Sequence, residues 1–432
     1  MSRVAKLIMA ARVAQALLAI AKASASRRFL RSPTASAPPY DGGRVAVHVL
    51  IPLLHEAPRV QRLLDGWEQL LAAHDELVLV VLTTAREEVD RVAGTSGTRG
   101  ALVADGRLAA WTEAGRARQL HYPRFNRTYG EQVRWGVEQV RQTCASADYV
   151  LLVNADSRID DEGIRQLLGA VHQGYACVQQ SAVFLANFAH LNPVPAAEAL
   201  LQSTWTVETE LFRYLAGSGT IRWLPQRVQS IWYQHSVGHG LLISMDLLDL
   251  IGGLPNPDIG LEDSALGYLI RSHGERVRPL RRLELADAPS SVRALLRQRA
   301  TWVRGPIGAL WYGPTSRRER LLVAQALYDG ARWAFMLPAI CVEMILLGPR
   351  GRRLRALVFV LRRYTTLALM LGSLPELTDY GVEKPPVRKL AVALLVYPVA
   401  VLSYGAGGLR GAIEIVREWK TGRLRIQPKT DA

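Results

Sequence analysis

The sequence predicts an α/β domain, in which helices cover a mostly parallel sheet, followed by membrane-associated helices. Between residues 45 and 185, short apolar runs alternate with segments of helical periodicity. The runs are nearly continuous in Val, Leu and Ile, which is typical of strands buried on both faces of a parallel sheet. Longer apolar segments lie towards the ends of the chain, where they favour helices in contact with a membrane.

Each apolar run is assigned to a strand and each periodic segment to a helix. The expected strands are Val45–Pro52, Leu77–Leu82, Tyr149–Val153 and Ala176–Leu185. The expected helices are Arg59–Ala72, Tyr129–Arg141 and Ile164–His172. Because parallel strands need a crossover connection, which is usually a helix, this order predicts a Rossmann-like sheet. Ligands of such sheets bind at the carboxyl ends of the strands, so the residues after each run are the candidates for chemistry.

The composition excludes several classes of protein. With 49% hydrophobic residues the chain is too apolar to be intrinsically disordered, and its 432 residues are too many for a small disulfide-stabilised domain. A mean hydropathy of +0.06 is too low for a polytopic transporter. The three cysteines form no CxxC pair, which argues against a disulfide framework or a structural zinc site.

The net charge of +15 lies mainly at the two ends of the chain. Residues 1–31 carry seven basic and no acidic side chains, and residues 348–432 carry 15 basic and six acidic ones. The centre, residues 32–316, is nearly neutral, with 27 basic and 29 acidic side chains. A nucleic-acid-binding protein would carry such charge on its folded body, so nucleic acid is not an expected partner. Basic ends beside apolar segments instead favour anionic membrane lipids.

Three apolar segments near the C-terminus are candidate membrane segments. Leu390–Leu409 has no charged residue and is long enough to cross a bilayer, and the basic residues that follow it favour a cytoplasmic end. Trp333–Gly348 is short for a span, and Ala356–Leu374 contains Arg362 and Arg363. We therefore expect one to three spans, mixed with interfacial helices, at the cytoplasmic membrane. Buried helices of a soluble domain are the alternative.

The chain divides into five predicted regions. An amphipathic interfacial helix is expected over residues 1–23, because Arg12 and Lys22 interrupt a run that otherwise resembles a signal peptide. Residues 24–44 are rich in Ser, Pro, Ala and Arg, as is typical of a linker. The remaining regions are the α/β domain over 45–288, an interfacial helical region over 289–320, and membrane-associated helices with a basic tail over 321–432.

The first candidate site follows the expected strand Tyr149–Val153. There, Asn154-Ala155-Asp156-Ser157 places one carboxylate at the mouth of the sheet. Magnesium is usually held by one or two carboxylates together with substrate phosphate, so Asp156 is a candidate metal ligand. Asp-Ser also begins turns and caps helices, and this alternative stays open.

The second candidate site is the acidic pair Glu262-Asp263, which opens a helical segment after a Gly/Pro-rich loop. Such a pair suits a general base that points into a cleft. Helix dipoles also stabilise acidic residues at a helix start, so a structural role is the alternative. Gly238-His239-Gly240 precedes this segment, and His239 is a candidate for lining the same cleft or, equally, a hydrogen-bonded structural histidine.

The third candidate site is the segment Gln298–Trp302, on a helix that Ser290 or Ser291 could cap. Gln298 and Trp302 are four residues apart and therefore share one helical face. A Trp can stack on a sugar or base ring, and an amide or guanidinium can bind a diphosphate. Packing of an aromatic side chain between helices is the alternative.

In order and spacing, these pieces resemble the membrane-associated family 2 glycosyltransferases, which include the cellulose and hyaluronan synthases. The resemblance runs from about Val45 to Gly305 and rests on five motifs. They are Pro52 with His55-Glu56, similar to the family's Pro and Asn-Glu; Asn154-Ala155-Asp156-Ser157, similar to Asp-Ala-Asp-Ser; Val178-Gln179-Gln180, similar to its Val-Gln strand; Leu261-Glu262-Asp263, similar to Thr-Glu-Asp; and Gln298-Arg299-Ala300-Thr301-Trp302, similar to Gln-x-x-Arg-Trp.

The resemblance implies a GT-A fold and an inverting transfer of a sugar from a nucleotide-sugar, with UDP-sugar expected, to a lipid or saccharide hydroxyl. It implies that the catalytic domain faces the cytoplasm. It implies that Asp263, next to Glu262, is the base, and that Asp156 holds a divalent cation, Mg²⁺ or Mn²⁺. The other implied donor-binding residues are Pro52, His55, Glu56, Thr83, Gln298, Arg299 and Trp302. The implied acceptor-binding residues are Gly238, His239, Gly240 and Trp302.

Three positions depart from the family pattern. The strand that ends at Thr83 lacks the nucleotide-binding aspartate, Asn154 replaces the first aspartate of Asp-x-Asp, and Thr301 replaces the arginine of Gln-x-x-Arg-Trp. The metal is left with one expected side-chain ligand, and Arg299 or Arg304 is the candidate for the missing charge. Because one to three segments are too few for a polymer channel, we expect a single transfer.

Two other functions fit the same sheet. One is a non-catalytic, membrane-docked GT-A-like protein that binds a ligand or scaffolds a partner. The other is a nucleotidyltransferase, which shares the sheet and the metal chemistry. The Glu-Asp pair and the Gln-x-x-x-Trp spacing favour the glycosyltransferase over the nucleotidyltransferase, whereas the non-catalytic protein stays open as the alternative.

Overall fold

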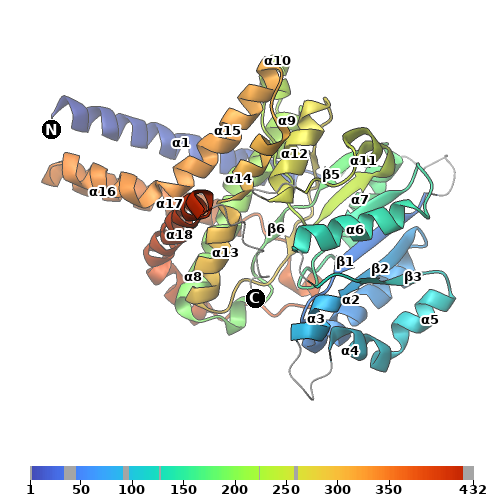
Figure 1. Ribbon diagram of the computed structural model, residues 1–432. Helices are drawn as coiled ribbons and strands as arrows, with labels where there is room; N and C mark the ends of the chain where they lie inside the picture. The colour runs from blue at the N-terminus through green and yellow to red at the C-terminus, as the bar shows by residue number, and fades with distance from the viewer. Residues whose placement is uncertain are drawn as a thin grey trace.

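A sheet of seven strands forms the centre of the protein (Figure 1). The computed structural model describes residues 2–33, 45–90, 97–125, 128–222, 224–256 and 261–421. The strand order is β3-β2-β1-β4-β7-β5-β8, and β6 and β9 form a separate two-stranded sheet. The bounds are β1 Val47–Pro52, β2 Leu77–Thr84, β3 Ala117–Tyr122, β4 Tyr149–Leu152, β5 Cys177–Gln179, β6 Ala182–Val183, β7 Leu241–Ser244, β8 Arg278–Pro279 and β9 Glu284–Leu285.

The sheet is mostly parallel, as predicted. Every neighbouring pair is parallel except those of β7, which is antiparallel to both β4 and β5. Leu152, the last residue of β4, pairs with Leu241, the first residue of β7. The residues just before β7, Gly238 to Gly240, therefore lie at the same edge of the sheet as Asn154 and Asp156.

Helices cover both faces of the sheet, because strand side chains alternate between the two faces. One core cluster joins Val49 and Ile51 of β1 to α2 and α7, and the other joins Leu50 to α6, α11 and α12. The helices of this domain are α2 Val60–Ala73, α3 Ala85–Asp90, α4 Thr98–Asp105, α5 Arg107–Glu113, α6 Tyr129–Arg141, α7 Asp161–His172, α9 Leu211–Ser218, α10 Gln226–Ser230, α11 Met245–Ile251 and α12 Glu262–Ser272.

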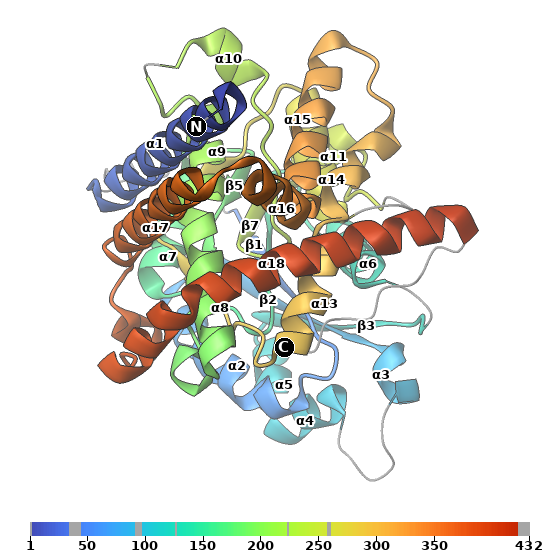
Figure 2. The same cartoon turned by 90° about the vertical axis from the view of Figure 1, so that its left-hand side faces the viewer.

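The helices outside the sheet domain form a second body beside it in Figure 1, and in Figure 2 this body faces the viewer. They are α1 Arg3–Arg31, α8 Pro193–Trp205, α13 Val292–Trp302, α14 Gly305–Gly308, α15 Arg317–Ala334, α16 Met336–Leu346, α17 Pro349–Leu371 and α18 Val387–Thr421. Helix α18 crosses α8 and α13, and α1 lies along α17. Gly407 and Gly411 permit the close crossing, because a Cβ at either position would overlap Arg299 or Val303 of the neighbouring chain segment. The 3₁₀ turns are Ala57–Arg59, Phe188–His190, Ala309–Tyr312 and Leu377–Tyr380.

Two predicted elements differ from the structure. The expected strand Ala176–Leu185 is split into β5 and β6, which belong to different sheets, because Gln180 leaves the ladder and its N–H donates to Gly240 O at 2.7 Å. The N-terminal helix continues to Arg31, past the expected end at residue 23, since no Gly or Pro interrupts it before Ser32. The rest of the expected linker, 34–44, and the basic tail from 422 lie outside the described residues.

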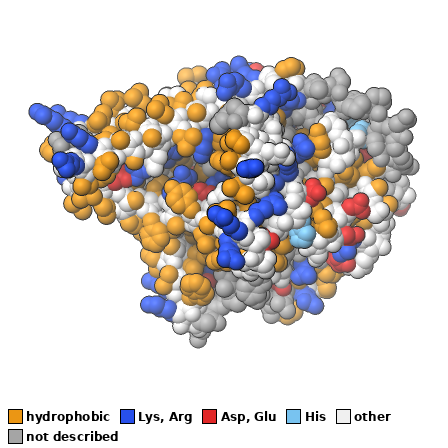
Figure 3. Space-filling model, turned by 90° about the horizontal axis from the view of Figure 1, so that it is seen from above, with side chains coloured by type: hydrophobic (Ala, Val, Ile, Leu, Met, Phe, Trp, Pro, Cys, Tyr) orange, Lys and Arg blue, Asp and Glu red, His pale blue; other side chains and the backbone are white. Residues whose placement is uncertain are grey.

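The second body presents apolar side chains to its surroundings. Helix α1 buries small residues such as Ala16 and Ala19, whereas Leu7 is 71% exposed. Ile345 of α16 and Leu395 of α18 are 77% and 79% exposed. Seen from above, hydrophobic side chains gather on the side where α1 and α16 project (Figure 3). Among the described helices, α1 and α18 are long and apolar enough to cross a membrane, while α16 is shorter.

Candidate active site

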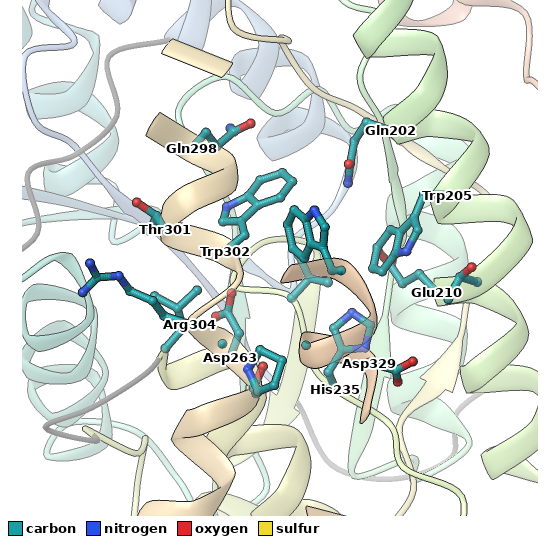
Figure 4. Close-up of a pocket in the computed structure, with 18 of the residues that line it drawn as sticks. Gln202, Trp205, Glu210, His235, Asp263, Gln298, Thr301, Trp302, Arg304 and Asp329 are labelled. Carbon is teal, nitrogen blue, oxygen red and sulfur yellow. The ribbon is translucent and has the colours of Figure 1, made fainter. Parts of the chain in front are cut away.

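A single large cavity brings the candidate residues together. Its volume is about 1160 Å³, and it extends from the carboxyl edge of the sheet into the helical body. Side chains from α8 and α13 point into it from different sides, and Asp263 lies below them (Figure 4). The expected site residues that line it are Pro52, Glu56, Asp156, Gly238, His239, Glu262, Asp263, Gln298 and Trp302.

The acidic pair lies in the first turn of α12 and faces the cavity. Neither carboxylate forms an ion pair with a described basic residue. Burial raises the pKa of Glu262, and burial together with the Glu262 carboxylate raises the pKa of Asp263 well above the usual range. Gly238 packs against this pair, because a Cβ there would stand 2.7 Å from Asp263 Oδ1. A carboxylate with a raised pKa in a cavity has the properties of a general base.

The end of the cavity at the sheet, where the donor is expected, is built around the residues after β1 and β4. Tyr129 Oη donates to Asn154 Oδ1 at 2.8 Å, so the side-chain oxygen of this asparagine is already engaged in a hydrogen bond. Asp156 faces the cavity, as does Asp287, whose Oδ1 is buried and accepts no hydrogen bond among the described residues. Glu56 pairs with Arg59 at 2.9 Å.

A divalent cation fits this end of the cavity. Three carboxylates (Glu56, Asp156 and Asp287) lie at this end of the cavity; Glu56 pairs with Arg59, and Asp287 pairs with Arg59 and Arg62. Carboxylate oxygens are the ligands that Mg²⁺ and Mn²⁺ prefer. Asp156 and the Oδ1 atom of Asp287, which both line the cavity, are the groups that suit such an ion.

His239 links the two halves of the site. Its Nδ1 lies 3.0 Å from Glu284 Oε1, and the same carboxylate oxygen accepts a hydrogen bond from Ser157 Oγ. Burial lowers the pKa of an imidazole, but the Glu284 carboxylate outweighs burial and raises the pKa of His239 to about 9. At neutral pH the cavity therefore holds a cationic imidazolium. Its charge interacts with the carboxylates of Asp156 and Asp263.

Helix α13 supplies Gln298 and Trp302, and Ser291 caps it as expected, accepting a hydrogen bond from Ala294 N–H. Gln298 Oε1 is buried and accepts no hydrogen bond among the described residues, which leaves it available to a ligand. The Trp302 ring centroid lies 6.2 Å from that of Phe184, and the Arg299 guanidinium lies 4.4 Å from the Trp302 centroid.

Four expected site residues do not line the cavity. Arg299 is buried in a bidentate pair with Glu198, with both N–O distances at 2.9 Å, and so supports Trp302 from behind. The Thr83 hydroxyl donates to Leu120 O between β2 and β3. His55 is exposed, with a left-handed φ of 58°. Gly240 has a φ of 61°, and a Cβ there would collide with Gln180 O.

The structure adds residues that the motifs do not indicate. A π-helical turn, Thr206–Glu210, joins α8 to α9 and places Glu208 and Glu210 in the cavity wall. Such turns often occur at functional sites. Burial raises the pKa of Glu210 to about 7. No sequence motif marks His235 or Glu284. The segment 206–210 could have been found from its two acidic residues, which interrupt an otherwise apolar helix.

A second group of possible metal ligands lies away from this cavity. His48, Cys144 and Asp148 have ligand atoms within 4.8 Å of one another, near the amino ends of β1 and β4. Both oxygens of Asp148 already accept backbone N–H bonds, from Ala46 and Ala145 at 2.9 Å. Asp148 therefore has a structural role, because its two oxygens join the backbone just before β1 to the backbone before β4. All three cysteines of the chain are free.

Comparison with known proteins gives likenesses of fold. No family model matches the chain, and no curated protein matches it either. The mannosyltransferase PcManGT from Pyrobaculum calidifontis, solved in complex with GDP-Man and Mn²⁺, is similar with a TM-score of 0.50 and 16% identity, over 85% of this chain and 97% of that chain. Residues 1–349 of TarS from S. aureus are more distant, with a TM-score of 0.38 and 11% identity over 90% and 98% of the two chains.

The likeness to the mannosyltransferase confirms the predicted fold class. The chain has a mostly parallel α/β domain of glycosyltransferase type, with two apolar helices near its ends that are long enough to span a membrane.

Proposed function

We propose that the protein is an inverting family 2 glycosyltransferase, related to the cellulose and hyaluronan synthases, that moves a hexose from a nucleotide-sugar to a hydroxyl acceptor at a membrane. The observation that carries the proposal is the shared cavity of Asp263 and Asp156. A base and a cation-binding carboxylate are the two groups that an inverting transfer needs. The mannosyltransferase of similar fold is solved with GDP-Man, so the donor nucleotide, expected to be UDP, has to be tested against GDP.

The proposed reaction assigns one role to each of these groups. Asp263 takes the proton from the acceptor hydroxyl, whose oxygen attacks the anomeric carbon of the donor. The bond from that carbon to the diphosphate oxygen breaks, and the nucleoside diphosphate leaves. The raised pKa of Asp263 matches this role, because a base is most effective when its pKa lies near the working pH. Attack from the side opposite the leaving group gives inversion.

The remaining groups position the substrates. Asp156 would hold Mg²⁺ or Mn²⁺, and the cation would neutralise charge on the leaving diphosphate. Trp302 offers a ring face to a sugar, and the unsatisfied Gln298 oxygen accepts a hydrogen bond from a ligand hydroxyl. His239 presents a positive charge to the same region.

The apolar exterior of the helical body supports a site at the membrane. Helix α1 turns its large apolar residues outward and its small ones inward, which is the reverse of a soluble amphipathic helix and is typical of helices packed in lipid. Arginines near these helices suit anionic headgroups. We place the catalytic domain on the cytoplasmic side and expect a single transfer, since the two long apolar helices among the described residues are too few to enclose a polymer channel.

The proposal is tested by a donor screen. The purified full chain is incubated with UDP- and GDP-sugars, with Mg²⁺, Mn²⁺ or EDTA, and with membrane extract as the source of acceptor. Release of nucleoside diphosphate and labelling of the extract are measured. We expect release with one donor, dependent on metal and abolished by Asp263→Asn.

A matched control for this variant is Asp246→Asn. Asp246 lies in the first turn of α11, as Asp263 does in α12, but it is exposed and outside the cavity. Release of pyrophosphate would identify a nucleotidyltransferase instead. Binding of a donor without any turnover, equal in wild type and Asp263→Asn, would identify a non-catalytic binding protein.

A further inference from the structure

The inner end of the cavity has a different character from the donor end. Five arginines line it, from α1, α15 and α17, together with Glu208 of the π-helical turn. We call this part of the cavity the arginine chamber. Its arginines are Arg12, Arg332, Arg355, Arg362 and Arg363. None of them belongs to a motif predicted to bind the donor.

The arginine chamber has an excess of positive charge. Arg362 pairs with Glu208 at 2.6 Å, and Arg12 and Arg355 share Glu343. Five guanidiniums thus face two carboxylates. Burial raises the pKa of Glu208, but Arg362, Arg363 and Arg332 more than reverse this and lower it below the usual range. That effect places all three guanidiniums around one carboxylate.

Two of these arginines have no acidic partner. Among the described residues, no carboxylate lies within ion-pair distance of Arg332 or Arg363. Arg363 instead lies 5.9 Å from the Phe359 ring centroid, and its Nε is buried with no hydrogen-bond acceptor among those residues. Arg332 is exposed, but Arg363 is half-buried. A half-buried guanidinium without a partner is costly unless an anion completes the site. Guanidiniums bind phosphate oxygens in a fork geometry, which makes a phosphate the anion of choice.

The walls of the arginine chamber are otherwise apolar. Met336, Ala339 and Ile340 of α16 and Val358 of α17 line it. The outer side of the same helix, α16, exposes Ile345 and neighbouring apolar residues. A ligand in the arginine chamber therefore contacts both apolar side chains and guanidiniums. This combination argues against a nucleic acid and favours an amphiphile.

We propose that the arginine chamber binds the phosphate of a phosphate-bearing lipid, and that this lipid is the acceptor. The second part rests on the proposed function, because it requires Asp263 to act on a hydroxyl of the same molecule. The arginine chamber and Asp263 line one cavity, so a lipid anchored by its phosphate can present a hydroxyl to the base. The lipid chain leaves along α16 and α17 towards the apolar exterior.

A binding experiment tests the site without any donor. The probe is dihexanoylphosphatidic acid, which carries a phosphate and short chains and stays soluble. Inorganic phosphate supplies the headgroup alone, and dihexanoylglycerol supplies the chains alone. Binding to the detergent-purified full chain is measured by calorimetry. We expect the phosphatidic acid to bind at least about tenfold more tightly than either fragment, since charge and apolar contact add.

The variants are Arg363→Gln and Arg332→Gln, which leave no carboxylate orphaned. Each should weaken phosphatidic acid binding about tenfold or more, as expected for the loss of a charge-assisted contact. The control is Arg353→Gln, on the same helix as Arg363 but exposed and outside the cavity. Equal effects of all three variants would show that binding depends on general surface charge, and would overturn the proposal. Equal affinity for inorganic phosphate and for phosphatidic acid would also overturn it, because it would indicate a free-phosphate site.

The acceptor role is tested separately from the site. Donor hydrolysis without acceptor should be the same in wild type, Arg363→Gln and Arg353→Gln, whereas transfer to chloroform-extractable anionic lipid should fall only in Arg363→Gln. Donor turnover with no labelled lipid would overturn the acceptor role and leave the glycosyltransferase intact. No donor turnover in wild type, with phosphatidic acid binding retained, would overturn the function and leave the lipid site.

Discussion

Replacing Asp263 by asparagine should stabilise the protein while it abolishes transfer. The carboxylate is half-buried in the cavity wall, lies beside the half-buried Glu262, and forms no ion pair with a described basic residue. Keeping it charged in the fold therefore costs desolvation and repulsion, whereas the Asn amide carries no charge and can donate to Glu262. An unsatisfied buried polar group costs about 1–3 kcal/mol, so we expect the free energy of unfolding to rise by about that amount at pH 7.5.

The gain in stability should depend on pH with a defined sign. Because the folded-state pKa of Asp263 is raised, folding takes up a proton above the ordinary pKa of an aspartate, about 3.9. Wild type then loses stability as pH rises from that value through the folded-state pKa, and Asp263→Asn lacks this loss. The difference in melting temperature between the two should be small at pH 4.5 and should reach roughly 2–6 °C at pH 8.

The assay is thermal unfolding of the detergent-purified chain from pH 4.5 to 8, with Asp246→Asn as the control. Asp246 occupies a first helical turn but is exposed, so its loss should cost about 0.3–1 kcal/mol through the helix dipole, the opposite sign. Nucleotide release by Asp263→Asn should fall by about 10²–10⁴-fold. If this variant is instead less stable than wild type, by a margin that does not grow with pH, Asp263 is a satisfied carboxylate and no longer a candidate base.

Three other changes follow from packing and charge. Arg299→Met should destabilise the fold by about 3–5 kcal/mol by orphaning buried Glu198, and adding Glu198→Met should restore much of the loss; a double variant no better than the single one would contradict the pair. Gly411→Ala should lower the melting temperature sharply, because its Cβ would overlap α13, whereas Gly66→Ala, with open space around it, should not. Chelation by EDTA should abolish nucleotide release, and Asp156→Asn should raise the Mn²⁺ concentration needed for half-maximal release at least about tenfold, which unchanged metal dependence would refute.

The parts of the fold that local signals specify could be predicted from the sequence. Helix α6 begins and ends where expected, because its apolar stripe is periodic and Thr128 and Glu131 form a capping box at its start. Strand β4 is a continuous apolar run between polar residues and needs no long-range information. The mostly parallel order follows from strands that alternate with helices.

The break between β5 and β6 could not be predicted, because it depends on a distant segment. Gln180 bonds to Gly240, and the Gln179 amide donates to His239 O at 2.7 Å, across 60 residues. The site shows the same limit. Asp156 follows a continuous apolar run and Asp263 follows a Gly/Pro-rich loop, so local sequence marks both residues. Glu284 meets Ser157 only through folding, across 127 residues, and nothing in the sequence around Glu284 marks it.

The charge balance of the cavity bears on the proposed reaction, because the chain has Thr301 where the resemblance expects an arginine. Arg299 and Arg304, the two arginines nearest to that position, are both neutralised by carboxylates: the first by Glu198, the second by Glu414 and Glu418 of α18. Neither is free to meet a diphosphate. The positive charge that the cavity does present comes from His239, held by a buried glutamate, and from the inner arginines. In the proposed reaction, the His239 imidazolium, together with a cation that Asp156 would hold, would therefore balance the leaving-group charge that a guanidinium at position 301 would otherwise share.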